Sequence, residues 1–208
     1  MGTVNSGVLK GVSGKVGDLV LYERDGKTCV RSMPGSVKKS QTPLQLNQRK
    51  KMTLVNNFLQ PFTKLLKRTF ADPQSGKRAY NLAKSYNLQH GTKGFGETLE
   101  MNYQTALLCK GPLSEPFDVK GSANESGLTI QWKYDSKAGS PSDTLLVIRR
   151  HKEHVWFDFL FSGAKPSDLT YHWHLGPNDK VEDYHFWVAF TDQMGEKMSN
   201  SVYVEIGD

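Results

Sequence analysis

The second half of the chain most constrains the fold, because β-prone runs recur there at short, regular intervals. Clusters of Gly, Pro, Asn, Asp and Ser separate these runs. Seven strands are expected: Phe117–Ser122, Leu128–Tyr134, Thr144–His151, His154–Phe161, Leu169–His174, Tyr184–Thr191 and Ser201–Ile206. This number of short strands in about ninety residues is typical of a β-sandwich.

Alternation within two of these runs predicts which side chains face the core. One face carries Leu128, Ile130 and Trp132, and another carries Tyr184, Phe186, Val188 and Phe190. Both cysteines, Cys29 and Cys109, precede this region, which excludes the disulfide of antibody domains. The pattern therefore predicts an all-β immunoglobulin/fibronectin-III-like sandwich over residues 117–208.

The first half predicts an α+β part built from a β-hairpin and helices. Asp25-Gly26 between two β-prone runs is a type I′ turn signal. Thr42, Pro43 and Gln45 form the start signal of a helix whose apolar residues then recur three or four apart, and Pro61 should kink or split it. A shorter helix is expected over Arg78–Asn87, and a strand within "TLEMNYQTALLCKG". We expect a domain over residues 1–110, a linker over 111–116, and the sandwich thereafter.

Charge is distributed unevenly between the two halves. Residues 1–95 contain 17 Lys and Arg against 4 Asp and Glu, a net charge of +13, whereas residues 96–208 have a net charge of −7. A basic half favours a polyanion partner such as nucleic acid. Attraction between the two halves, or between neighbouring copies, explains the asymmetry equally well. The candidate polyanion-binding residues are Lys15, Arg24, Lys27, Arg31, Arg49, Lys50, Lys64, Lys67 and Arg68.

The glycine-rich "GVLKGVSGKVG" does not fit a nucleotide-binding loop. A Walker A loop requires glycine where Leu9 stands, and Ser or Thr where Val16 follows Lys15. The glycines also precede a predicted strand and not a helix, which excludes a dinucleotide loop. Backbone turns leading into the hairpin explain these glycines better, so no cofactor is predicted.

Histidines offer the one alternative that involves a metal. His172 and His174 would point to the same side of a strand, and His151, His154 or His185 would have to supply a third ligand. An outward-facing cluster is the simpler interpretation, so no metal site is predicted and a metal-dependent enzyme is the least favoured function. No nucleophile motif is present, and we expect no enzyme activity. Two distant cysteines and the lack of an apolar leader or membrane-length segment predict a cytoplasmic protein, or one built into a particle after synthesis.

Several motifs occur in one order along nearly the whole chain. They include "SGKVGDLVLYERDGKTCVRSMP", "TPLQLNQRKKMTLVNNFLQPF", "AYNLAKSYNLQHG" and "MSNSVYVEI". Together they resemble an uncharacterised bacterial family of unknown function, of a type common in Bacteroidota. Its members show a Gly-Lys-Val-Gly hairpin, here Gly14–Gly17, and a Thr-Pro-x-Gln-x-x-x-Arg helix start, here Thr42 to Arg49. The resemblance supports the architecture and implies no activity.

The sequence thus favours a non-catalytic binding or scaffold protein. Its basic half would contact a polyanion, with nucleic acid as one candidate, and its sandwich would contact protein. The alternative is a structural subunit of a phage-like or surface assembly, in which the chain binds copies of itself. No membrane and no small-molecule substrate are expected as partners.

Overall fold

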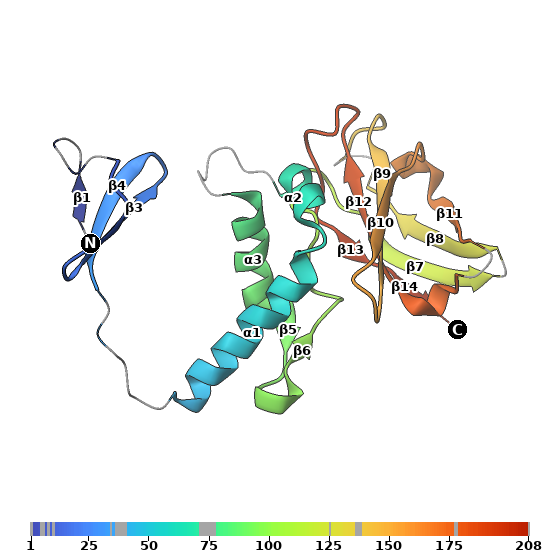
Figure 1. Ribbon diagram of the computed structural model, residues 1–208. Coiled ribbons are helices and arrows are strands. Elements are labelled where there is room, and N and C mark those ends of the chain that lie inside the picture. Colours follow the sequence, from blue (N-terminus) through green and yellow to red (C-terminus); the bar gives the residue numbers. More distant parts are fainter. Residues whose placement is uncertain are drawn as a thin grey trace. The chain divides into compact units, whose positions relative to one another are not determined.

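The computed structural model describes residues 2–4, 7, 9, 11–33, 35, 41–70, 78–124, 126–135, 139–176 and 179–207. The chain forms two compact units, Met1–Gln41 and Thr42–Asp208 (Figure 1). The division at Gln41 differs from the one expected at residues 111–116. The predicted helices belong to the same unit as the sandwich, and the reason lies in their shared core.

The first unit is a four-stranded antiparallel sheet with the strand order β1-β4-β3-β2. Its strands are β1 (Gly2–Val4), β2 (Gly14–Val16), β3 (Leu19–Arg24) and β4 (Lys27–Ser32). The φ angles of Asp25 and Gly26, 52° and 72°, are both left-handed, as a type I′ turn requires. The predicted hairpin is confirmed, and one further strand flanks each side of it.

Three helices open the second unit: α1 (Pro43–Leu59), α2 (Thr63–Thr69) and α3 (Ala79–His90). Thr42 caps α1 in a reciprocal capping box with Gln45, and Pro43 occupies the first turn. Pro61 falls between α1 and α2, where the sequence predicts a break. The start and end of α1 therefore follow from local chemistry alone.

The sandwich consists of two four-stranded sheets with the orders β10-β9-β12-β13 and β11-β8-β7-β14. The first contains β9 (Thr144–His151), β10 (Phe157–Phe161), β12 (Tyr184–Thr191) and β13 (Val202–Tyr203). The second contains β7 (Phe117–Asn124), β8 (Gly127–Lys133), β11 (Thr170–His174) and β14 (Glu205–Gly207). All seven predicted strands are present. The last one divides into β13 and β14, which belong to opposite sheets.

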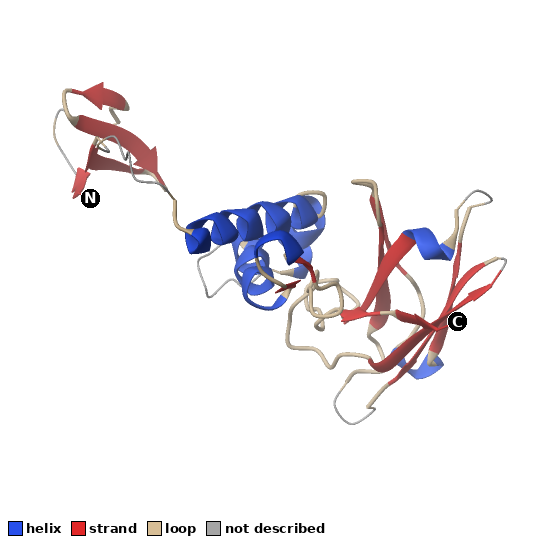
Figure 2. Cartoon of the chain, turned by 90° about the horizontal axis from the view of Figure 1, so that it is seen from below, coloured by secondary structure: helices blue, strands red, loops and turns tan. Residues whose placement is uncertain are grey.

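Two cores lie on opposite faces of β9 and β12. Between the sheets, Val147 and Phe186 pack with the predicted core residues Leu128, Ile130 and Trp132. On the other face, the helices bury a second set of side chains from the same two strands. That set is Leu146, Ile148, Trp187 and Ala189. The helices thus form a third layer against the sandwich (Figures 1 and 2), which explains why no domain boundary falls between them.

The segment expected to be a strand within residues 98–111 is mostly irregular. Only β6 (Glu100–Met101) is extended, and it pairs with β5 (Thr92–Lys93). Side chains replace the missing backbone ladder around Leu107 and Leu108. Buried Asn87 bonds both the amide and the carbonyl of Leu107, and Ser201 accepts from the amide of Leu108. Buried backbone groups need a hydrogen-bond partner, but a side chain can serve as well as a strand. The apolar residues of this segment are therefore buried in the helical core without forming a strand.

Candidate functional site

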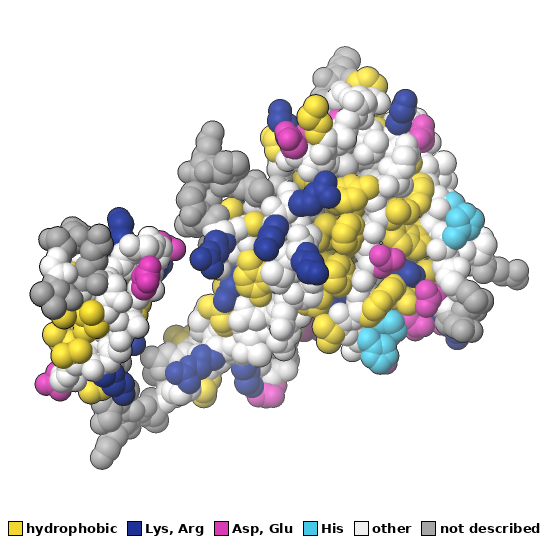
Figure 3. All heavy atoms as spheres, turned by 45° about the horizontal axis from the view of Figure 1, so that its top comes forward, with side chains coloured by type: hydrophobic (Ala, Val, Ile, Leu, Met, Phe, Trp, Pro, Cys, Tyr) yellow, Lys and Arg dark blue, Asp and Glu magenta, His cyan; other side chains and the backbone are white. Residues whose placement is uncertain are grey.

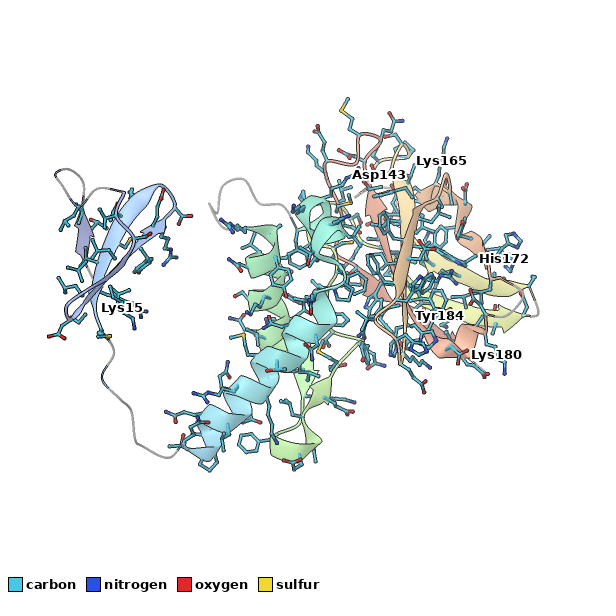
Figure 4. The ribbon with its side chains drawn as sticks, viewed as in Figure 1. Lys15, Asp143, Lys165, His172, Lys180 and Tyr184 are labelled. Atoms are coloured by element: carbon cyan, nitrogen blue, oxygen red, sulfur yellow. The ribbon has the colours of Figure 1, made fainter. Side chains whose placement is uncertain are left out.

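The strand register places the four hairpin cations on one face of the first sheet. Residues directly opposite in an antiparallel pair share a face, and Lys15 lies opposite Val20, which lies opposite Arg31. Arg24 lies opposite Lys27 and, four residues beyond Val20, points to the same side. We call Lys15, Arg24, Lys27 and Arg31 the basic sheet face (Lys15 is labelled in Figure 4).

Tyr22 lies on the basic sheet face, between its two rows of cations. The guanidinium of Arg31 lies 6.0 Å from the centre of the Tyr22 ring. Arg24 pairs with the neighbouring Asp25 at 3.6 Å, and both side chains are largely exposed. This surface combines exposed positive charge with an aromatic ring, the two elements that bind phosphates and stacked bases.

The opposite face of the same sheet is mainly apolar, except near the Asp25-Gly26 turn, where Glu23 lies opposite Thr28. Val16, Leu19, Leu21 and Val30 share it by register. Leu21 is buried, but Val16 and Leu19 remain 54% and 44% exposed. The first unit thus has one basic face and one incompletely covered apolar face.

The helices carry the other predicted cations. Together α1, α2 and α3 contain seven Lys and Arg and no Asp or Glu. Arg49, Lys64 and Lys67 are exposed and form no ion pair within the described part of the chain. Figure 3 shows Lys and Arg side chains gathered over one face of this unit, beside a band of hydrophobic side chains.

Two of the predicted cations have partners that the sequence did not reveal. Lys50 forms an ion pair with Glu97, which lies in a short 3-10 helix (Gly96–Thr98) after β5. The hydrogen bond from Lys50 and its charge hold the pKa of Glu97 below its usual range. Arg68 lies 4.9 Å from the centre of the Phe161 ring. Of these two predicted polyanion-binding residues, Lys50 therefore already has an acidic partner within the chain.

Sequence reasoning missed a cluster around Arg149, which is almost fully buried. Its guanidinium pairs with Asp179 at 3.0 Å and with Asp158 at 3.7 Å. It also lies 4.6 to 5.4 Å from the ring centres of Trp156, Trp173 and Tyr184 (Tyr184 is labelled in Figure 4). This aromatic cage is filled by the chain's own arginine, so it connects loops and strands and leaves no room for a cationic ligand.

Asp179 completes this cluster. Burial alone would raise the pKa of Asp179, but hydrogen bonds from Tyr184 and Arg149 lower it overall. The carboxylate is therefore ionised at neutral pH and balances the buried guanidinium. The only signal in the sequence is an arginine at the end of an apolar strand, because its partners come from four separate stretches of chain.

The histidines occupy separate places in the sandwich. His172 bonds with Ser126 and Thr129, and its ring lies next to that of His174 (His172 is labelled in Figure 4). The rings of His151 and His154 lie together at the turn before β10. His185 lies on the helical side of β12 and bonds with Tyr203. Among the residues described, no three His, Cys, Asp or Glu side chains are arranged to hold a metal ion.

The relationship to known sequences is clear over most of the chain. The model of a family described as "Family of unknown function (DUF6266)" matches residues 11–205. The chain belongs to this family. The match includes the hairpin, the helical layer and the sandwich.

Other comparisons add little about function. No curated protein matches the chain. Among solved structures, a similar one is described as an Fn3-like protein from Clostridium thermocellum, with 9% identity and a TM-score of 0.32. The similarity covers 47% of this chain and 96% of that protein. Within the described residues, no helix has both the length and the apolar character needed to cross a membrane.

Proposed function

We propose that the protein is a non-catalytic binding protein whose basic sheet face holds a polyanion, with single-stranded nucleic acid as the favoured ligand. The observation that carries this proposal is the register of the first sheet, which places Lys15, Arg24, Lys27 and Arg31 on one face around Tyr22. In the second unit, Arg49, Lys64 and Lys67 add further exposed positive charge. The sandwich is proposed to contact protein.

Single strands suit this face better than duplex does. Each phosphate neutralised by Lys or Arg releases counterions, which supplies affinity without requiring a shaped groove. A tyrosine among the cations offers a platform on which a base can stack, and stacking contributes about 1–3 kcal/mol per base. In a duplex the bases are stacked on one another, so a duplex could bind this face only through its phosphates.

Salt-dependent binding of the full chain to a fluorescent single-stranded oligonucleotide tests the proposal. The Lys15→Gln/Arg31→Gln variant removes two cations of the basic sheet face. We expect weaker binding and a salt slope shallower by about 1.4, because each single-strand phosphate contact contributes about 0.7. A matched control, Lys152→Gln/Lys165→Gln, removes the same charge from exposed positions of the sandwich and should leave the slope nearly unchanged.

Two outcomes would contradict the proposal. One is no measurable binding of the full chain at low salt. The other is an equal loss of slope in both double variants, which would show that net charge alone, and not the basic sheet face, attracts the oligonucleotide. Tyr22→Leu adds a second check, since it should reduce binding to single strands more than binding to duplex.

A second candidate function is supported by the apolar face of the first sheet. Exposed Val16 and Leu19 beside Val30 would be covered if this face packed on another copy of the chain, as in a structural subunit of an assembly. Molar mass measured by light scattering across a range of concentrations would test this function. A larger species that Leu19→Lys disperses would support it, and a monomer at every concentration would exclude self-assembly.

A further inference from the structure

Strand β10 ends its sheet, and its outer edge has no partner strand in the described residues. The amide of His151 bonds the carbonyl of Trp156, and the amide of Ser162 bonds the carbonyl of Leu145. In an antiparallel pair, the backbone N–H and C=O groups of every second residue point toward the partner strand. On β10 and its flanks, the backbone groups that point toward β9 are those of Trp156, Asp158, Leu160 and Ser162. The backbone groups of Phe157, Phe159 and Phe161 therefore point outward, where another strand could pair with them.

The side chains along this edge are unusually apolar for an exposed strand. Phe159, Leu160 and Trp156 are 37%, 44% and 46% exposed. Edge strands commonly carry charges or proline that discourage pairing. On β10 the one charged residue is Asp158, whose carboxylate accepts a hydrogen bond from the outward-pointing amide of Phe159 at 2.8 Å. An arriving strand would have to displace that single contact.

Helix α2 runs beside β10 and supplies charge. The ring centres of Phe62 and Phe157 lie 4.6 Å apart at one end, and Arg68 lies over Phe161 at the other. Lys64 precedes Arg68 by four residues and thus projects from the same side of α2. Lys64 and Arg68 form no ion pair among the residues described.

We propose that β10 accepts an extended segment of a partner protein as an additional strand, and that this segment alternates acidic and apolar residues. The inference rests on the proposed protein-binding role of the sandwich and names its surface. Acidic side chains of the added strand would lie on the helical side, near Lys64 and Arg68. Apolar side chains would lie on the other side, against Trp156 and Leu160. Backbone pairing supplies affinity and the alternating faces supply specificity.

A second copy of this chain is a poorer occupant. Pairing of β10 with β10 of another molecule would bring the two α2 helices, each rich in Lys and Arg, toward one another. Like charges close together oppose such an association. Charge complementarity therefore favours an acidic segment from a different protein.

Fluorescence anisotropy of the full chain with a labelled peptide of alternating Glu and Val tests the proposal. We expect saturable binding that Lys64→Glu/Arg68→Glu weakens about tenfold or more, because two attractive contacts become repulsive. A peptide of alternating Lys and Val should show the opposite preference and bind the charge-reversed variant better. The matched control Arg49→Glu/Lys84→Glu reverses two charges elsewhere on the helices and should change the affinity for either peptide less than twofold.

Methylated peptides separate strand addition from simple charge attraction. Methylating every second amide removes donors from one edge of the peptide only. One set of methylated amides should abolish binding and the other set should preserve it, since a strand added to a sheet uses alternate amides. Should Arg68→Glu unfold the chain, Lys64→Glu alone and the methylated peptides still decide the question.

Three results would overturn the inference. These are no binding of the Glu-Val peptide, equal binding of both methylated peptides, or equal loss of affinity in the two charge-reversed variants. The residues of this edge belong to the second unit, whereas the basic sheet face belongs to the first. Failure of the peptide experiment alongside intact oligonucleotide binding would therefore remove this inference alone, and the polyanion proposal would stand.

Discussion

His185 connects sheet and helices at the level of a single residue. Its ring stacks on Tyr103 with the centres 3.8 Å apart, and its Nδ1 bonds the hydroxyl of Tyr203 at 3.0 Å. Burial, followed by the nearby charges of Lys152 and Arg150, lowers the pKa of His185 from 6.5 to about 4. The folded chain thus holds a neutral imidazole in a place where a proton would be strongly disfavoured.

This pKa shift predicts a loss of stability in acid. Below pH 6.5, His185 is protonated in the unfolded chain but stays neutral in the folded chain. The free energy of unfolding therefore falls as pH falls from 6.5 to about 4. The contribution of His185 to this loss is about 2 kcal/mol at pH 5. Urea unfolding at several pH values should show a smaller decline for His185→Gln than for the unchanged chain. Exposed His174→Gln is the control, and an unaltered decline in His185→Gln would refute the assignment.

Single residues were the hardest part to predict from sequence. The Asp25-Gly26 turn predicts that Arg24 lies opposite Lys27, but Lys15 lies on β2, a strand beyond the predicted hairpin. The Arg149 cluster was not predictable, because Asp158, Asp179 and Tyr184 meet only after β9, β10 and β12 have assembled. The pairing of Lys50 with Glu97 likewise depends on how the chain returns toward α1.

At the level of elements, α1 begins where its sequence specifies. The hydroxyl of Thr42 accepts from the amide of Gln45, and the side chain of Gln45 accepts from the amide of Thr42. Thr42→Ala should lower the free energy of unfolding by about 1 kcal/mol, because two backbone donors lose or loosen their partners. Thr53→Ala, at an exposed position within α1, should be neutral or slightly stabilising, since alanine favours helix. Equal effects of the two substitutions in urea unfolding would contradict the capping role.

Local signals also explain which elements could be predicted. Turns, caps and proline breaks act over a few residues, so the hairpin and the bounds of α1 follow from the sequence. Alternation revealed one buried face of β12, but "FWVAF" is apolar at every position. A continuous apolar run is the mark of a strand buried on both sides, and what covered the second side was not visible locally. The segment around Leu107 was predicted as a strand because its apolar residues signal burial without specifying extended pairing.

At the level of the whole molecule, the helical layer and the sandwich depend on one another. Trp187 is fully buried by contacts that include Phe58 and Tyr103, and its indole donates to the carbonyl of Tyr103. Without residues before Phe117, this face of β9 and β12 would expose Leu146, Ile148, Trp187 and Ala189 to water. Such a continuous apolar surface is unfavourable for an isolated domain. Separating the sandwich at residues 111–116 would therefore uncover this face of β9 and β12.

This dependence predicts how fragments of the chain behave. A fragment of residues 42–208 should unfold in one cooperative transition, because its helices and sheets share a core. A fragment of residues 117–208 should be poorly folded, bind a hydrophobic dye and lack the sharp thermal transition of the longer fragment. Circular dichroism and dye fluorescence on the two fragments make the comparison. A stable, cooperatively folding 117–208 fragment would contradict this prediction, because it would show that the sandwich folds without the helical layer.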